Sequence, residues 1–278
     1  QESAGSGVQI SRPPRGGDPP PPGPWTWTLN WDPIVSRDIT PPQTNAAQEA
    51  ERLADPLVLV GSCPRLPEDV DRLVDEAGVE AILCLQSDAC FEALGIEWEA
   101  IRQRALARGV LMVRVAVRDF DRLDQAQMLP EMVRMLGALA AMDKRTYVHC
   151  TAGINRANLT VVGFLTFVRG MALDDAMAMV REARPQANPY AVSWQTARAR
   201  LLAGREQDLY LQTQLAGNTM DDGGDWLARD WSGAEVALIQ QILQRQIDVE
   251  VATLRAVEDM SKMQAQQQRR RPKLFGLL

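Results

Sequence analysis

The sequence of 278 residues contains only one histidine and four cysteines, and its formal net charge is −6. It has no apolar run of about 18 residues, the length from which a membrane-spanning helix is inferred. A negative net charge argues against nonspecific binding of nucleic acid, because that binding needs a basic surface to displace counterions. The cysteines follow no regular spacing and Cys84 lies in an apolar stretch, which favours free thiols over a disulfide framework.

The first segment of the sequence is dominated by proline, glycine and serine. Residues 1–24 have too few apolar side chains to offset the entropy lost on folding, and we expect them to be a disordered arm. Trp25, Trp27 and Trp31 follow, and indole rings are costly to leave in water. Residues 25–56 are therefore expected to dock, either on the domain's own surface or on a protein partner. The sequence starts with glutamine, from which we expect a processed chain whose organelle transit peptide has been removed.

Short apolar runs then alternate with helical patterns. Strands separated by helices predict an α/β fold, in which a central, mostly parallel sheet is flanked by helices. We expect the domain to span residues 57–204, with only helices after Cys150. The predicted strands are residues 57–60, 79–85, 110–117 and 146–149, and the predicted helices are residues 68–77, 97–108, 124–144, 157–169, 173–183 and 189–202.

Cys150 and Arg156 flank the turn between the last predicted strand and the following helix. A loop of this length can point successive backbone N–H groups inward, and the helix N-terminus adds unpaired amides. Such a cradle fits a phosphate dianion and also favours a thiolate. We predict that Cys150 is the nucleophile and that Arg156, a planar fork of donors, clamps the phosphate. The phosphate-binding loop between them consists of Thr151, Ala152, Gly153, Ile154 and Asn155.

Three residue types in and beside this loop support the interpretation. Gly153 is expected where the backbone leaves no room for a side chain, and Asn155 is the residue type that best accepts a positive φ after glycine. His149 is expected to hydrogen-bond nearby backbone and to orient groups without transferring protons. The alternative for Cys150 is a buried thiol at a strand end with no catalytic role.

The leaving-group oxygen of a phosphate ester needs a proton, and no second histidine is present to give it. Asp119 and Asp121 follow a predicted strand, at the sheet edge where α/β proteins bind ligands. Either carboxylic acid is a candidate for the proton donor, and an ordinary acidic loop is the alternative. We expect no cofactor and no metal, because the thiolate and Arg156 supply the nucleophile and the charge stabilisation.

The loop from His149 to Arg156, together with Asp119-Phe120-Asp121, resembles the dual-specificity phosphatases, and particularly the plastid glucan phosphatases of the starch-excess group, kin to laforin. The similarity runs from about Trp31 to Leu202. It implies that Asp119 is the general acid, with Asp121 in support, and that Phe120 faces a glucan. Trp31 is also expected to contact the substrate.

Some positions differ from that group. Asn155 stands where the group has glycine, Asn158 where it has proline, and Leu94 where it has an aromatic residue. Residues 205–231 are expected to be a linker, in which Asp225-Trp226 resembles the group's C-terminal segment.

A long amphipathic helix is predicted for residues 232–268. We expect its first half to pack on the domain, and residues from about Val249 onward to contact a protein partner. The basic tail, residues 269–278, is either solvated or bound to a partner or membrane surface. The apolar stripe has spacings of three and four and consists of Val236, Ile239, Leu243, Ile247, Val251, Leu254 and Val257.

Two classes of function follow. The first class is a phosphatase whose substrate is phosphorylated glucan in a plastid, with phosphoprotein as the next substrate in rank. The other is a phosphatase fold that serves as a scaffolding subunit of an organellar complex. Cys150, Arg156 and Asp119 favour the enzyme, because a scaffold does not need all three. The terminal extensions and the differences at Asn155, Asn158 and Leu94 favour the scaffold.

Overall fold

The computed structural model describes residues 29–37, 55–215 and 233–270. Several expectations lie outside the described residues: the arm at 1–24, Trp25 and Trp27, the Asp225-Trp226 segment, and the end of the basic tail at 271–278.

A five-stranded sheet forms the centre of the molecule, in the order β1-β2-β5-β3-β4. β1 pairs antiparallel with β2, and the remaining pairs are parallel. The predicted α/β fold with a mostly parallel sheet is therefore confirmed. The strands are β1 Trp31–Ser36, β2 Pro56–Gly61, β3 Ala81–Gln86, β4 Leu111–Val117 and β5 Thr146–His149.

Helices cover both faces of this sheet, because successive strand residues point to opposite sides and both sides are apolar. Leu59, Ile82 and Tyr147 belong to one buried cluster, whereas their neighbours Leu83 and Val148 belong to the other. Helices α2 Pro67–Ala77, α3 Asp88–Leu94 and α4 Trp98–Ala107 pack on the first side. The other side carries α5 Arg122–Ala141, α6 Arg156–Gly163, the π-helix η1 Phe164–Val168, α7 Leu173–Ala183 and α8 Ala191–Leu202.

The strand β1 lies before residue 57, where the domain was predicted to begin. Residues 31–36 were expected in a docking segment, but they form an edge strand of the sheet, and Ile34 is fully buried. Its proline at position 33 is compatible with an edge strand, because one side of an edge needs no backbone donor. The domain therefore includes β1.

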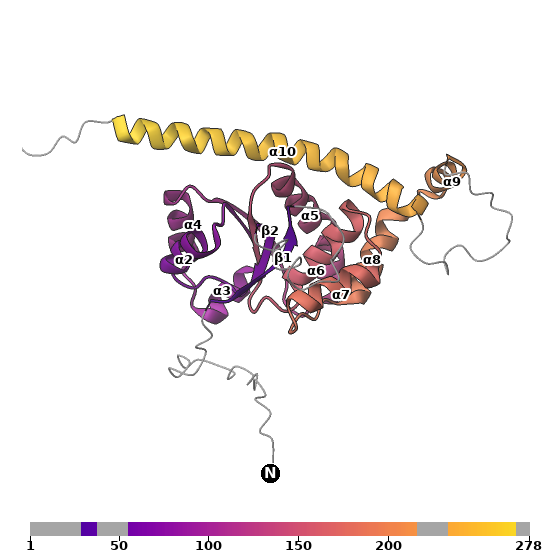
Figure 1. Ribbon diagram of the computed structural model, residues 1–278, viewed down its shortest axis with the longest axis horizontal. Helices are drawn as coiled ribbons and strands as arrows, with labels where there is room; N and C mark the ends of the chain where they lie inside the picture. Colours follow the sequence, from indigo (N-terminus) through magenta and orange to yellow (C-terminus); the bar gives the residue numbers. More distant parts are fainter. Residues whose placement is uncertain (1–28, 38–54, 216–232, 271–278) are drawn as a thin grey trace, which may run out of the picture.

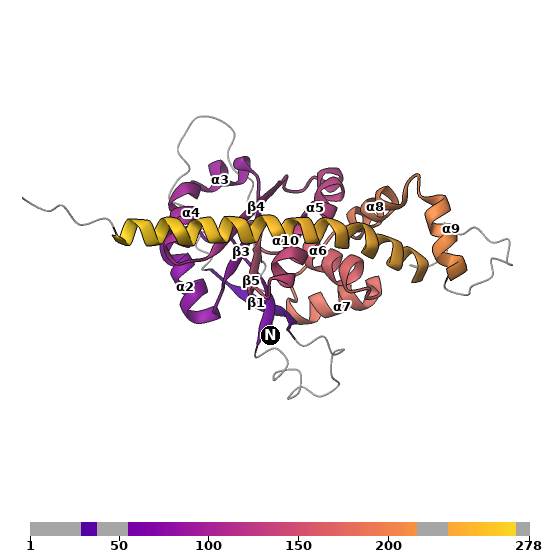
Figure 2. The ribbon, with the colours of Figure 1, turned by 90° about the horizontal axis from the view of Figure 1, so that it is seen from above.

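The helix α10, Gly233–Arg270, follows α9, Glu206–Leu215, which falls in the expected linker. α10 runs along the outside of α5 (Figures 1 and 2). A Cβ atom at Gly137 of α5 would lie 2.6 Å from the Cδ1 atom of Ile247, so glycine permits this close approach.

The expected end of this packing at Val249 is wrong. Leu254 is 7% exposed and belongs to the main core, and Glu258 forms an ion pair of 2.9 Å with Lys144. The stripe continues to pack because α5 and the turn after it extend beneath the helix. Met260 and Met263 are 56% and 59% exposed, so the part of α10 beyond the domain begins about ten residues later than expected. Within the described residues, no helix is long and apolar enough to cross a membrane.

Candidate active site

The predicted site residues come together at the carboxyl edge of the sheet. β5 ends at His149, and α6 begins at Arg156, so the intervening loop lies above the central strand. β4 ends at Val117, two residues before Asp119, and lies on the far side of β3 from β5. Because parallel strands end at the same edge, residues distant in sequence meet there.

Arg156 is the buried centre of the site. Its side chain is 1% exposed. One terminal nitrogen donates to the Val117 carbonyl at 2.8 Å, and the other donates to Thr151 Oγ1 at 3.1 Å. Gln86 also donates to the Thr151 hydroxyl, at 3.3 Å. These contacts fix the guanidinium directly under the loop, where a charged group would be costly to bury without partners.

Asp119 forms an ion pair with Arg156, with 2.7 Å between Oδ2 and the guanidinium nitrogen. Asp121 has a different place. Its side chain accepts hydrogen bonds from the backbone of Leu123 and Asp124, which makes it the N-cap of α5. The structure thus separates the two candidate acids by position.

Phe120 lies between the two aspartates, with its side chain 75% exposed and φ at 58°. Positive φ is unusual for a bulky residue and marks local strain, which here accompanies a hydrogen bond from the Phe120 amide to Asp119. No local sequence pattern predicts this conformation. The expected positive φ at Asn155 is wrong: Asn155 has φ −112°, and its side-chain amide donates to the Asn188 carbonyl.

Gly153 has φ +66°, and a Cβ atom there would lie 2.3 Å from the Gly61 carbonyl oxygen. No side chain fits, because the neighbouring atom is backbone. The glycine lets the loop approach the end of β2 closely.

His149 is fully buried, and its Nδ1 lies 3.0 Å from the Cys150 carbonyl oxygen. Burial lowers the pKa of His149 to about 4. The ring is therefore neutral at pH 7, and Nδ1–H donates to the backbone. Cys150 itself is 3% exposed.

A second cysteine lies beside the site. The Cys90 sulfur is 3.4 Å from an Arg156 nitrogen and 3.4 Å from the Ser87 hydroxyl. Burial opposes ionisation of this thiol, but the hydrogen bonds from Ser87 and Arg156 outweigh it and lower the pKa of Cys90. By contrast, burial raises the pKa of Cys63 to about 12. Spacing alone could not single out Cys90, since it lies in a different element from Arg156.

Trp31 opens β1 at the same edge, opposite Gly61 in register. Its ring packs against the second core cluster and lies 5.6 Å from the guanidinium of Arg72. The residue is only partly buried. Within the described ranges, no group of three His, Cys, Asp or Glu side chains could hold a metal ion.

Residues 86–197 match the family model described as dual specificity phosphatase, catalytic domain. This match includes the phosphate loop, so the resemblance to the dual-specificity phosphatases is confirmed. Similar curated proteins include phosphoglucan phosphatases and laforin. An amyloplastic phosphoglucan phosphatase of Castanea sativa is 36% identical over 131 residues, which cover 46% of this chain and 35% of that protein.

Two further relatives are a chloroplastic phosphoglucan phosphatase of Arabidopsis thaliana and laforin of Mus musculus. The first is 32% identical and covers 44% of this chain and 21% of that protein; the second is 28% identical and covers 47% and 42%. The chain thus spans less than half the length of each of these relatives. A crystal structure of PTPMT1 with PI(5)P has 20% identity and a TM-score of 0.43, and covers 50% of this chain and 86% of that one.

Proposed function

We propose that this protein hydrolyses phosphomonoesters through a cysteinyl-phosphate intermediate and that its substrate is phosphorylated glucan in a plastid. The observation that carries the proposal is the buried Arg156, which contacts the loop at Thr151 and the acid at Asp119. The family match and the phosphoglucan phosphatases among the relatives support it.

We assign the steps of this reaction to Cys150, Asp119 and Arg156. The Cys150 thiolate attacks phosphorus, the bond from phosphorus to the ester oxygen breaks, and Asp119 donates a proton to the departing alcohol. In the second step water attacks the cysteinyl phosphate, Asp119 takes a proton from that water, and the thiolate leaves with inorganic phosphate as the product. The loop amides and Arg156 stabilise the charge on the transferred group in both steps.

The ion pair between Asp119 and Arg156 must break when substrate phosphate binds to Arg156. A phosphate dianion in the loop competes with the Asp119 carboxylate for the same guanidinium. Substrate binding would therefore release Asp119 from Arg156 and allow it to carry the proton that the first step requires.

Two further observations support the glucan substrate and the plastid location. Phe120 presents an exposed aromatic ring beside the acid, which suits contact with a sugar ring. Two relatives carry amyloplastic or chloroplastic in their names. Phosphoprotein is the next substrate class.

The test measures phosphate released from solubilised starch, from a phosphopeptide and from an aryl phosphate, without added metal. The wild-type chain should release phosphate from starch, and Cys150→Ser should release none from any substrate. Activity on the peptide but not on starch would reject the glucan. Full activity of Cys150→Ser would reject the mechanism.

The second candidate, a scaffolding subunit, is favoured by the exposed Met260 and Met263 beyond the packed part of α10. We propose that this end of the helix contacts a protein partner. Light scattering of the chain with and without residues 259–278 tests self-association through it. A monomer in both cases, with no protein captured from the native source, would reject this role.

A further inference from the structure

The loop carbonyls from Cys150 to Ile154 are all hydrogen-bonded. The Cys150 carbonyl accepts from His149, and the Thr151 carbonyl accepts from the backbone amide of Cys63 at 2.9 Å. The remaining three carbonyls are held mainly by two side chains: Arg184 donates to Ala152 at 3.2 Å and to Gly153 at 2.6 Å, and Asn158 donates to Gly153 and Ile154, both at 2.9 Å.

The direction of these carbonyls fixes the direction of the amides. In a trans peptide the C=O and the next N–H point to opposite sides of the chain. Holding the carbonyls of Ala152, Gly153 and Ile154 from one side therefore turns the N–H groups of the next three residues toward the other side. That is the geometry an anion cradle needs.

Both side chains are themselves fixed. Asn158 is fully buried in the first turn of α6. Arg184 is 1% exposed, and its guanidinium also pairs with Asp32 of β1 and donates to the Asn30 side chain at 2.8 Å. Burying an arginine is costly unless its donors are used, and here two of the acceptors are loop carbonyls.

We propose that Arg184 and Asn158 are positioning residues for the phosphate loop and that Asp32 holds Arg184 in place. This inference rests on the proposed function. Neither side chain needs to touch the substrate; they preset the peptide planes so that binding does not have to reorganise the loop. Asn158 supplies two side-chain N–H donors, and both are used on loop carbonyls.

The experiment measures the affinity of tungstate, a phosphate-like oxyanion, for the full chain by calorimetry at pH 7. The variants are Arg184→Met and Asn158→Leu, each close in size to the residue it replaces. The matched control is Arg145→Met at the opposite end of the sheet. Arg145 likewise pairs with a carboxylate, Asp55, and donates to two backbone carbonyls, those of Pro56 and Ala77.

Arg184→Met and Asn158→Leu should each weaken tungstate binding by about tenfold or more, while Arg145→Met should bind like the wild type. Arg184→Lys, which keeps a cation beside Asp32, should recover part of the loss. If Arg184→Met does not fold, judged by circular dichroism, Asn158→Leu and Arg184→Lys decide the question.

Wild-type affinity in the folded variants would overturn the positioning role. A wild-type chain that binds no tungstate at all would instead overturn the proposed function, so the two failures can be told apart.

Discussion

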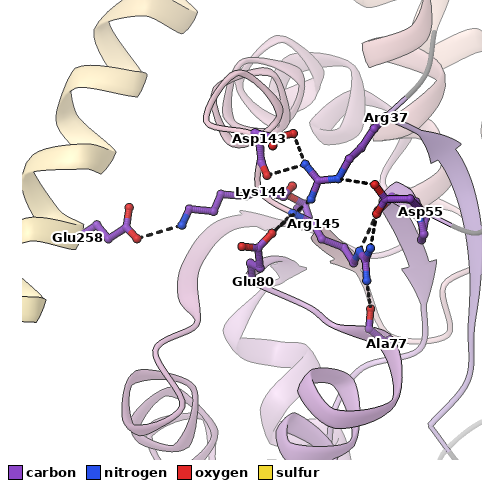
Figure 3. A network of polar contacts seen from close by, with 10 residues as sticks. Arg37, Asp55, Ala77, Glu80, Asp143, Lys144, Arg145 and Glu258 are labelled. Atoms are coloured by element: carbon purple, nitrogen blue, oxygen red, sulfur yellow. Dashed lines mark hydrogen bonds and ion pairs between the residues drawn. The ribbon is translucent and has the colours of Figure 1, made fainter.

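Two arginine clusters lie at opposite ends of the same sheet. The amino-edge network consists of Arg37, Asp55, Glu80, Asp143 and Arg145 (Figure 3), and in it Arg37 pairs with Asp55, Glu80 and Asp143. The phosphate-loop cluster consists of Arg156, Asp119, Arg184 and Asp32.

The two clusters have similar chemistry but different exposure. The side chains of Arg37 and Arg145 are 25% and 23% exposed, whereas those of Arg156 and Arg184 are each 1% exposed. Exposed ion pairs contribute about 0–1 kcal/mol each, and solvent screens them. A buried arginine costs much more to desolvate, so its retention points to a role beyond stability. We therefore assign structure to the amino edge and function to the carboxyl edge.

The same substitution at both ends should give the largest contrast. Arg156→Lys should lower kcat/KM for an aryl phosphate by about a thousandfold, because an ammonium cannot hold two phosphoryl oxygens in one plane. Arg145→Lys should change it less than about twofold. Steady-state kinetics of the two variants check the comparison, and similar losses at the two ends would break it.

Within the phosphate-loop cluster, the two aspartates should also differ. Asp119→Asn should lower the rate on a poor leaving group by about 100-fold to 10,000-fold, the range for a lost general acid. Asp121→Asn should cost little, because asparagine also caps a helix N-terminus. The loss at Asp119 should shrink for an acidic leaving group. Equal losses at both positions would show that the acid is misassigned.

The two ends should lose stability in different pH ranges. Burial lowers the pKa of His149 from 6.5 to about 4, so the unfolded chain binds a proton that the folded chain excludes, and about 3 kcal/mol of stability is lost as pH falls through that range. His149→Gln should lack this loss. Urea unfolding of both proteins at several pH values measures the difference.

The amino edge should respond only at lower pH. A hydrogen bond from Arg145 lowers the pKa of Asp55 below 3.8, so its contribution is complete above pH 3.8 and lost as pH falls below it. Asp55→Asn should therefore change the pH dependence of unfolding only below that value. For the His149 prediction, the contradicting result is a free energy of unfolding that depends on pH in the same way in the wild type and in His149→Gln.

The smallest effect should come from the contact between the amino edge and α10. Glu258→Gln removes the partly exposed ion pair with Lys144, which is also drawn in Figure 3, and should cost no more than about 1 kcal/mol without affecting activity. Leu254→Ala, a buried neighbour, is the matched contrast and should cost about 2–5 kcal/mol. Thermal unfolding compares them. A negligible cost at Leu254 would mean that α10 does not stay docked.

The parts of the fold that the sequence predicts are those with a local pattern of residues. The central strands are continuous apolar runs, so their positions and those of most helices between them were predicted to within a few residues, but the short helix α3, Asp88–Leu94, was not predicted. The segment of Cys150 and Arg156 is local, and its spacing alone indicated a phosphate cradle. β1 was missed because Pro33 interrupts its pattern and its partner β2 begins twenty residues after its end.

The contacts that complete the site are not local. Arg184 lies 31 residues from Gly153 and 152 from Asp32, and no spacing rule connects them. Asn158 was noticed as a departure from proline, yet its two hydrogen bonds to the loop depend on the turn that α6 makes. The number of α10 residues that pack on the domain depends on the length of α5. The apolar stripe of α10 alone does not reveal that length.

Cys150 should carry the phosphoryl group during turnover. The most direct measurement is acid quenching of the chain during turnover of an aryl phosphate, followed by digestion and mass spectrometry of the peptide that contains residue 150. We expect a phosphate attached to Cys150 in the wild type, more of it in Asp119→Asn when the leaving group is acidic, and none in Cys150→Ser. Turnover with no phosphate on that peptide, or with the phosphate on another residue, would contradict it.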